Sequence, residues 1–409
     1  MIAPVILRKD NARQALAGLP RMTRMGFNLL LSLQYGSLQV TLPDGRIFIV
    51  EGQEPGPDAV LDVHDMRFVR MVVQGGDVGV GEAYMAGYWS SPDVTTFLEL
   101  FCINRDATLE ALKGRPVMRV LLSIRHWLNA NTKRGSRRNI SAHYDLGNAF
   151  YREWLDETMT YSSAIFDERT QSLEAAQALK YASLVRETDI RPDHSVLEIG
   201  CGWGGFAEFV GKEVGANVKA LTISQEQYDF ARERIFKAGL NEKVDVCFQD
   251  YRDERGTYDR IASIEMFEAV GERYWPTYFQ KLSGCLKPGG RAGLQIITIQ
   301  DYMFEDYRRG TDFIQRHIFP GGMLPPPAKL AEIGKSLGLN MTAQKIFGQD
   351  YARTLAEWRS RFWDAWPRIR PLGFDDRFKR LWEFYLHYCE AGFRAGNIDV
   401  RQLVYVKSG

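Results

Sequence analysis

The feature that most constrains the fold of this chain is a glycine-rich turn between a short apolar run and a helical stretch. The run covers 196–199, glycines follow at positions 200, 202, 204 and 205, and the helical pattern continues to Val214. Glycine allows the backbone to turn sharply and lets a ligand approach the main chain closely. The order of strand, turn and helix therefore predicts a βα unit that holds a ligand at its turn.

The sequence after this turn alternates between β-rich and helical segments. Strands are predicted at 218–223, 244–248, 260–264, 294–299 and 400–406, and helices at 225–238 and 275–286. Strands that alternate with helices through short loops indicate a doubly wound parallel sheet, with ligands at the carboxyl ends of the strands. Residues from 301 to about 395 are mostly helical and aromatic, and most of these aromatic side chains are expected in the core.

The first 110 residues form a separate predicted module. Residues 37–42 and 47–50 are β-rich and flank a Pro-Asp-Gly turn, which is typical of a hairpin, and Asp93 is a predicted N-cap of an apolar helix. Residues 111–138 are helical and basic, which fits either a membrane-surface segment or a solvated linker. The predicted division is an N-terminal lipid- or substrate-binding domain at 1–110, a basic linker at 111–138 and a second domain at 139–409.

Composition narrows the class of protein. The chain has 409 residues, of which 45% are hydrophobic, so it can form a sizeable core, and its net charge of +1 argues against nucleic-acid binding. The five cysteines and six histidines are scattered, so neither a disulfide framework nor a metal site is predicted. The cysteine pattern fits a reducing cytosol, and no apolar run approaches the ~20 residues of a membrane-spanning helix.

Polar residues follow the predicted strands at the positions where a ligand would lie. Glu198 precedes the first glycine by two residues. Its carboxylate suits the ammonium group of S-adenosylmethionine, whereas a dinucleotide would place a pyrophosphate at this turn. Thr222 and Gln227 can hydrogen-bond ribose hydroxyls, and residues 249–251 can surround an adenine. Glu268 lies just past a strand end and is expected to face the same cleft.

Several short motifs in combination resemble one known family, the cyclopropane-fatty-acyl-phospholipid synthases with the related mycolic-acid methyltransferases. The resemblance runs from about Asn139 to Val406, with a weaker match at 81–85. The motifs that carry it are His143-Tyr144-Asp145-Leu146-Gly147-Asn148, Met159-Thr160-Tyr161-Ser162-Ser163-Ala164, the glycine-rich turn, Gln249-Asp250-Tyr251-Arg252-Asp253, Met266-Phe267-Glu268, Ile318-Phe319-Pro320-Gly321-Gly322 and Phe393-Arg394-Ala395.

The resemblance implies a Rossmann-like, class I S-adenosylmethionine-dependent methyltransferase fold, with an N-terminal α+β lipid-handling domain and a helical region that covers the substrate. It implies methyl transfer to the double bond of a phospholipid acyl chain. The expected protein is cytoplasmic, contacts unsaturated phospholipid peripherally at the inner membrane surface, and forms a homodimer by analogy. The expected cofactor contacts are Tyr161, Ser162, Glu198, Gly200, Gly202, Gly204, Thr222, Gln227, Gln249, Asp250 and Tyr251.

The resemblance also implies a base. Ring-forming members use a bound bicarbonate that is held by a cysteine, a glutamate, a histidine, an isoleucine backbone and a tyrosine. Here Glu268, Ile297 and Tyr351 match, whereas Ser163 replaces the cysteine and Gln295 the histidine. Serine and glutamine donate hydrogen bonds but do not titrate as histidine does. Glu268, Tyr351, Ser163 and Gln295 are the predicted catalytic residues, and the hypothesis is a methyl-branched or methylene-bearing product, with a cyclopropane as the alternative.

Two other classes of function stay open at this point. A methyltransferase of a soluble or quinone-like small molecule would carry the same cofactor turn, although the extra N-terminal residues favour a long apolar substrate. The two replaced ion ligands also fit a catalytically altered, lipid-binding homologue, although the cofactor motifs favour an enzyme.

Overall fold

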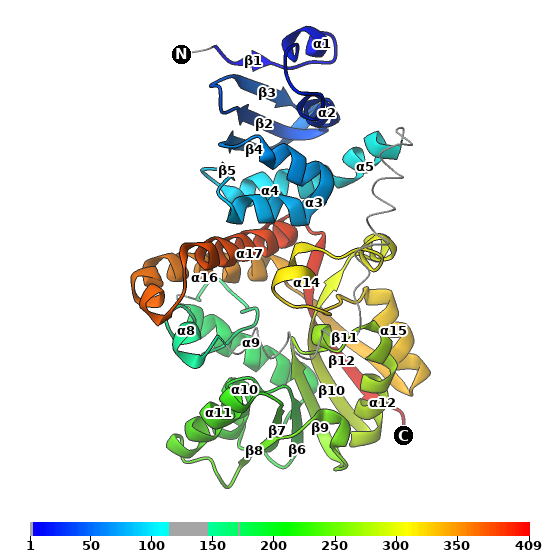
Figure 1. Cartoon of the computed structure of the whole chain (residues 1–409). Helices are drawn as coiled ribbons and strands as arrows, with labels where there is room; N and C mark the ends of the chain where they lie inside the picture. The colour runs from blue at the N-terminus through cyan, green and yellow to red at the C-terminus, as the bar shows by residue number, and fades with distance from the viewer. Residues whose placement is uncertain (1–2, 114–145, 171) are drawn as a thin grey trace. The chain divides into compact units, whose positions relative to one another are not determined.

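The computed structural model describes residues 3–113, 146–170 and 172–409 (Figure 1). Two compact units are present, and each combines segments that are distant in the chain. Unit 1 contains 1–131, 309–318 and 373–397, and unit 2 contains 132–308, 319–372 and 398–409. The predicted basic linker lies almost entirely outside the described residues, as do the first three residues of the motif that starts at His143.

Unit 1 is built on a five-stranded sheet in the order β1-β3-β2-β4-β5. The predicted hairpin is confirmed, because β2 (Tyr35–Thr41) and β3 (Ile47–Glu51) pair antiparallel with Thr41 opposite Ile47. The predicted cap is also confirmed: the Asp93 carboxylate accepts the backbone N–H of Thr96 at 3.0 Å at the start of α4. The other strands are β1 (Val5–Ile6), β4 (Glu54–Val63) and β5 (Trp89–Ser90), and the helices are α1 (Ala12–Ala15), α2 (Arg21–Leu30), α3 (Arg67–Met85), α4 (Val94–Ile103), α5 (Arg105–Lys113), α14 (Phe313–His317) and α17 (Asp376–Arg394).

Unit 2 is built on a seven-stranded sheet in the order β11-β12-β10-β9-β6-β7-β8. The strands are β6 (Ser195–Ile199), β7 (Asn217–Thr222), β8 (Val244–Phe248), β9 (Tyr258–Ile264), β10 (Leu286–Ile299), β11 (Leu339–Ile346) and β12 (Ile398–Lys407). Five of them, β6 to β10, are parallel as predicted, whereas β12 runs antiparallel between β10 and β11. The pattern did not reveal β11, in which Leu339 is the one buried residue and every second residue is exposed, and which lies in the stretch expected to be mostly helical.

The helices of unit 2 cover both faces of this sheet (Figure 1). Val196 belongs to a core with side chains of α9 (Leu173–Thr188), α10 (Gly205–Phe209) and α11 (Gln225–Lys237). Its neighbour Leu197 belongs to a second core with side chains of α12 (Trp275–Cys285) and α15 (Pro327–Ser336). Successive residues of a strand point to opposite faces, so a run of buried apolar residues indicates a sheet that is covered twice. The remaining helices are α8 (Asn148–Arg152), a π-helix (Val210–Val214), α13 (Phe304–Tyr307) and α16 (Gly348–Ile369).

Polar side chains interrupt the core under α9. Glu198, Gln295 and Gln402 are at most 2% exposed and lie on three strands of the sheet. The adjacent Leu197, Leu294 and Leu403 face the other core, so these three polar side chains point toward α9. The buried residues of α9 include Gln177, Lys180 and Ser183, which follow one another at helical spacing. The interface between α9 and the sheet is therefore polar, which is unusual for a core and requires hydrogen-bond partners.

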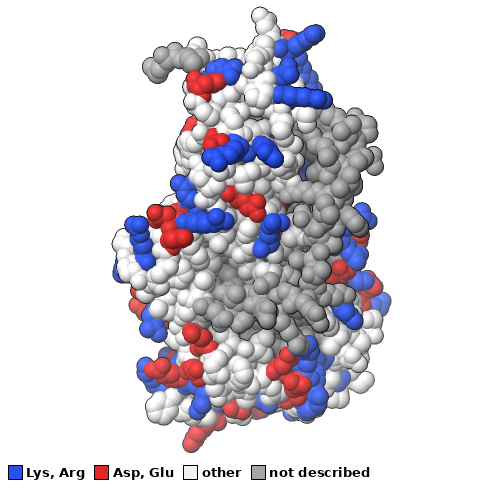
Figure 2. Space-filling view, viewed as in Figure 1, with Lys and Arg blue, Asp and Glu red and all other residues white. Residues whose placement is uncertain are grey.

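The described surface mixes charges of both signs. On the face drawn in Figure 2, Lys and Arg side chains are interspersed with Asp and Glu. Among the described residues, no helix is both long and apolar enough to cross a membrane.

Candidate active site

The glycine-rich turn follows β6 and is held against β7. The backbone N–H groups of Gly200 and Cys201 both donate to the carbonyl oxygen of Leu221, at 3.0 and 2.8 Å. Gly200, Gly202 and Gly204 have φ angles of 82°, 52° and 82°, which favour glycine. A Cβ at Gly200 would lie 2.7 Å from Cγ of Met266, whereas a Cβ at Gly202 would meet nothing within 4 Å. The turn therefore leaves open space beside the main chain for a ligand.

Glu198 lies at the start of this turn, and one of its carboxylate oxygens is unsatisfied. Its Oε2 atom is buried and has no hydrogen-bond partner among the described residues. Burial raises the pKa of Glu198 to about 8, and the charge of Lys180 opposes this shift. An unpaired, buried carboxylate oxygen beside the open turn fits the ammonium group of S-adenosylmethionine. Glu198 and the glycines would therefore hold the amino-acid end of that cofactor.

Lys180 connects Glu198 to the loop that contains Tyr161 and Ser162. Its Nζ atom is fully buried and donates to Oγ of Ser162 at 2.7 Å, and the amide of Gln177 donates to the Ser162 carbonyl at 2.9 Å. Burial lowers the pKa of Lys180 to about 7. The Tyr161 ring lies among other aromatic rings, with 5.2 Å between its centroid and that of Trp358. Lys180 was not predicted as a site residue, because a lysine in a helix is normally solvated.

The side chains expected at the nucleoside end follow β7 and β8. The hydroxyl of Thr222 donates to Oε1 of Gln227 at 3.1 Å, so these two predicted ribose contacts lie together. The Gln249 amide donates to Glu254, the Asp250 carboxylate binds Arg252, and the Tyr251 ring contacts the Tyr278 ring. Two large apolar side chains are exposed at the same strand ends, namely Ile223 (64%) and Phe248 (53%). Exposed apolar surface at two adjacent strand ends suits a flat ring such as adenine.

The predicted catalytic residues converge on a carboxylate that the sequence reading missed, that of Glu265. Its Oε1 atom accepts the backbone N–H of Ser163 at 2.8 Å and the side-chain amide of Gln295 at 2.8 Å. Its Oε2 atom accepts the hydroxyl of Tyr351 at 2.7 Å. Ser163 contributes its backbone, while its hydroxyl donates to the Ala164 carbonyl at 3.0 Å. Three of the four predicted residues therefore bind Glu265.

The backbone at Glu265 is specialised. The residue follows the last residue of β9 and has a φ of 49°, a left-handed conformation that is uncommon outside glycine. Its N–H donates to the Gln295 carbonyl at 2.8 Å, which ties it to the neighbouring strand β10. Strained conformations of this kind cluster at functional sites. The only sequence signal for Glu265 is its position as an acid at the carboxyl end of a strand. Glu268 was predicted in its place because Glu268 matches the family motif.

Glu268 lies beside this group without joining it. Its Oε1 atom accepts the backbone N–H of Ile297, and its Oε2 atom has no partner among the described residues. Burial raises the pKa of Glu268 to about 8, with a further contribution from the charge of Glu265. Burial also raises the pKa of Glu265, but the hydrogen bonds from Tyr351 and Gln295 lower it. Glu268 therefore keeps a proton near neutral pH, whereas the hydrogen bonds to Glu265 favour its charged form against the effect of burial.

The loop that presents Ser163 is fixed by the first two turns of α16 (Gly348–Ile369), the helix that also presents Tyr351. The Ala164 N–H donates to the hydroxyl of Thr354 at 3.1 Å, and the Phe166 N–H donates to the Asp350 carboxylate at 3.3 Å. The same helix therefore positions two of the donors to Glu265, the hydroxyl of Tyr351 directly and the backbone N–H of Ser163 through the loop.

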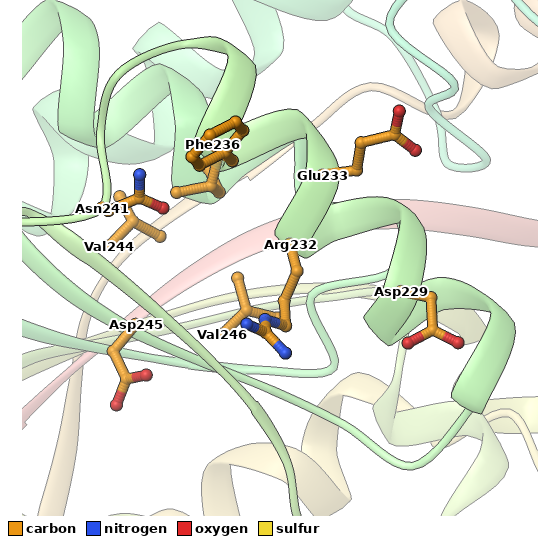
Figure 3. Close-up of a pocket in the computed structure, with 9 residues that line it drawn as sticks. Asp229, Arg232, Glu233, Phe236, Asn241, Val244, Asp245 and Val246 are labelled. Carbon is orange, nitrogen blue, oxygen red and sulfur yellow. The ribbon is translucent and has the colours of Figure 1, made fainter.

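A pocket of about 440 Å³ lies elsewhere in unit 2 (Figure 3). Its lining comes from α11 and from the start of β8, including Arg232, Phe236 and Asp245. None of the predicted site residues lines it, and it lies away from the carboxyl ends of the strands. We therefore do not assign the reaction to this pocket.

The sheet, the glycine-rich turn and the matching solved structures define a class I S-adenosylmethionine-dependent methyltransferase. A mycolic acid cyclopropane synthase structure, CmaA1 with SAH and CTAB, matches 66% of this chain and 98% of its own with 29% identity and a TM-score of 0.63. The cyclopropane synthase MmaA2 from Mycobacterium tuberculosis matches the same shares of the two chains with 28% identity and a TM-score of 0.62.

The family model for mycolic acid cyclopropane synthetase matches residues 131–403, and the chain belongs to this family. It is 37% identical to the tuberculostearic acid methyltransferase UfaA1 of Mycobacterium tuberculosis, over 83% of this chain and 81% of the relative. It is 33% identical to the cyclopropane-fatty-acyl-phospholipid synthase of Escherichia coli K12, over 87% of this chain and 89% of the relative. The predicted family, fold class and cofactor are confirmed, and the enzyme methylates or cyclopropanates unsaturated lipid chains.

Proposed function

We propose that this enzyme methylates the double bond of an unsaturated fatty acyl chain in a membrane phospholipid, and that the Glu265 carboxylate accepts the proton that then leaves the chain. The convergence of Ser163, Gln295 and Tyr351 on Glu265 carries the proposal. By the resemblance, these positions would hold a bicarbonate base. A carboxylate of the protein carries the same charge and takes the same donors, so it can do the same work.

The electron balance of the reaction requires a base and no oxidant or reductant. When bound, S-adenosylmethionine supplies an electrophilic methyl group on a positively charged sulfur. The alkene π electrons form the new carbon–carbon bond as the bond between sulfur and the methyl group breaks. The electron pair of the broken bond stays on sulfur, which leaves as a neutral thioether, and the positive charge moves to the acyl chain. The electron pair of a C–H bond then closes a ring or forms a new double bond, and the proton passes to Glu265.

The environment of Glu265 suits a proton acceptor for such a cation. Its three donors keep the carboxylate oriented, so it can accept a proton without rearrangement of the site. The neutral Glu268 beside it adds no second negative charge that would hold the cation in an unproductive ion pair. Neighbouring aromatic faces such as that of Tyr161 can stabilise positive charge without acting as bases.

We further propose that the proton leaves from a carbon of the acyl chain, so that the product is methyl-branched or methylene-bearing. Glu265 is a side chain attached to the protein, so its carboxylate can reach only one position along the bound chain. The name of the relative UfaA1 supports a methylated product, and that of the Escherichia coli relative supports a phospholipid substrate and a cyclopropane. Peripheral contact with the inner membrane surface and a homodimer belong to the same proposal.

The test is to incubate the full-length protein with methyl-labelled cofactor and vesicles of unsaturated phospholipid, and to examine the extracted lipid by proton NMR. Vinyl or methylene protons next to a new methyl or methylene carbon are the expected result. High-field cyclopropane protons as the main signal would overturn the proposed product but leave the substrate standing. Label that appears only in a soluble acceptor would overturn the lipid substrate.

A further inference from the structure

Gln295 uses both ends of its side-chain amide. The amide nitrogen donates to Oε1 of Glu265 at 2.8 Å and to the Ser163 carbonyl at 3.3 Å. The amide oxygen accepts a hydrogen bond from the side-chain amide of Gln402 at 3.1 Å. The two ends of an amide have nearly the same size, so hydrogen-bond partners decide which end faces which way. Gln402 donates to the amide oxygen and so favours the orientation seen here, together with the Ser163 carbonyl, which accepts from the amide nitrogen.

Gln402 lies directly opposite Gln295 in the pairing of β10 with β12, and its own orientation is fixed from α9. Its oxygen accepts the hydroxyl of Ser183 at 2.8 Å, and its nitrogen also donates to the Lys180 carbonyl at 3.1 Å. Both amide hydrogens of Gln402 therefore have acceptors. Ser183, Gln295 and Gln402 are at most 1% exposed, so water cannot replace a lost partner. A chain of hydrogen bonds thus runs from α9 through two amides to Glu265.

We propose that Gln402 is a positioning residue for proton removal, which holds the Gln295 amide so that its nitrogen, and not its oxygen, faces the Glu265 carboxylate. This inference rests on the proposed role of Glu265 as the proton acceptor. A reversed Gln295 amide would place its oxygen against Oε1 of Glu265. Two acceptors can then share a hydrogen bond only when the carboxyl group is protonated, and a protonated Glu265 accepts no proton.

Burying the Gln295 and Gln402 side chains lowers the stability of the fold relative to an apolar pair. Two amides must be desolvated at adjacent cross-strand positions, where leucine-like side chains would fill the same space. A fully satisfied polar network in a core gives a single defined geometry in return. The charged and titratable groups around Glu265 are Tyr351 from α16, Lys180 from α9 and Glu268 from the segment after β9. Gln402 carries no charge, so its effect on Glu265 passes through Gln295.

The test compares the pH dependence of the rate for the full-length protein and for Gln402→Met, which keeps the length of the side chain and removes its polar atoms. The assay uses methyl-labelled S-adenosylmethionine and unsaturated phospholipid vesicles. We expect the acid limb of the profile to move up by roughly one pH unit, about the effect of one hydrogen bond to a charged group, with a near-normal rate at high pH. Ser183→Ala should give a smaller shift in the same direction, and it serves as the second variant if the methionine variant does not fold.

Two controls separate positioning from a structural role. Ser195→Ala removes a hydroxyl that binds Asp259 at the opposite end of the sheet, and it should leave the pH profile unchanged. The double variant Gln295→Met/Gln402→Met should show the same acid limb as Gln295→Met alone, since Gln402 acts through Gln295. A folded Gln402→Met protein with an unshifted acid limb, or additive shifts in the double variant, would overturn the inference. A normal rate for Glu265→Gln would instead overturn the proposed base.

Discussion

Replacing Glu265 with glycine should make the enzyme dependent on added bicarbonate. The substitution removes five heavy side-chain atoms, and bicarbonate has four, so the vacated volume can accept the ion. The donors that remain are the N–H of Ser163, the amide of Gln295 and the hydroxyl of Tyr351, all of which lie 2.7–2.8 Å from the carboxylate in the native protein. Glycine also accepts the φ of 49° without strain, so the backbone should hold its path.

The magnitude follows from the role assigned to the carboxylate. A positioned general base contributes about 10²–10⁴-fold in rate, so Glu265→Gly should lose about that factor in buffer freed of bicarbonate. Added bicarbonate should restore part of the rate along a saturable curve, because the donor group binds one anion. The native enzyme should not respond to bicarbonate, because its own carboxylate occupies the donors.

The assay follows methyl transfer to phospholipid in degassed buffer with and without bicarbonate. Glu268→Gln is the matched control, because it neutralises a neighbouring carboxyl group whose side chain binds only the Ile297 backbone among the described residues. A native enzyme that loses its activity when bicarbonate is removed, together with a Glu265→Gly variant that retains full activity, would refute the assignment of Glu265 as the base.

Three further predictions concern single sites. Tyr351→Phe removes the donor to Oε2 of Glu265, so the acid limb of the pH–rate profile should move to higher pH, and an unchanged limb would contradict the hydrogen bond. Gly200→Ala should weaken cofactor binding measured by calorimetry by about tenfold or more, because its Cβ would meet Met266, whereas Gly215→Ala, with a similar φ of 80° and open space, should lose stability but not affinity. The pKa of Glu268 is raised from its usual value to about 8, so its contribution to stability is present at acid pH and is lost as pH rises toward 8. Glu268→Gln should therefore flatten the fall in unfolding free energy between pH 5 and pH 8.5, measured by denaturant titration. Parallel curves for the variant and the native protein would contradict the raised pKa.

The parts of the fold that could be predicted from sequence are those with a local signal. The glycine-rich turn, the hairpin of β2 and β3 and the cap at Asp93 each depend on neighbouring residues, and all are present. The antiparallel β12 and the strand β11 depend on pairing between residues far apart in the chain. The association of 309–318 and 373–397 with the N-terminal residues also depends on such contacts, so no local pattern could show it.

In the candidate site, too, the residues with a local sequence signal were predicted and those defined by distant contacts were not. Ser163, Gln295 and Tyr351 were predicted from the family resemblance, but their shared partner Glu265 does not match any of the family's site positions. Lys180 and Gln402 were missed because their importance comes from burial, which a helical or strand pattern does not assign to polar residues. A buried polar residue becomes visible only when its partners are placed, and these partners come from α9, β10 and β12.

The protonation of the site leads to one more prediction, which concerns cofactor binding. The carboxyl groups of Glu198 and Glu265 both interact with the buried ammonium of Lys180, and burial raises the pKa of Glu198 and of Glu268 to about 8. A bound cation lowers the pKa of neighbouring carboxyl groups, so binding of the positively charged cofactor at neutral pH should release protons and its affinity should rise between pH 6 and pH 8.

Calorimetric titrations with S-adenosylmethionine in two buffers of different ionisation enthalpy measure this release directly. Glu198→Gln should release fewer protons than the native protein, because Glu198 has the unpaired oxygen beside the turn. Glu332→Gln alters an exposed carboxylate that pairs with Lys329 on α15 and should leave the count unchanged. Equal heats in the two buffers would show that the site is already ionised before the cofactor binds. Glu198 would then be charged in the cofactor-free protein, and the ammonium group of the cofactor would not be needed to ionise it.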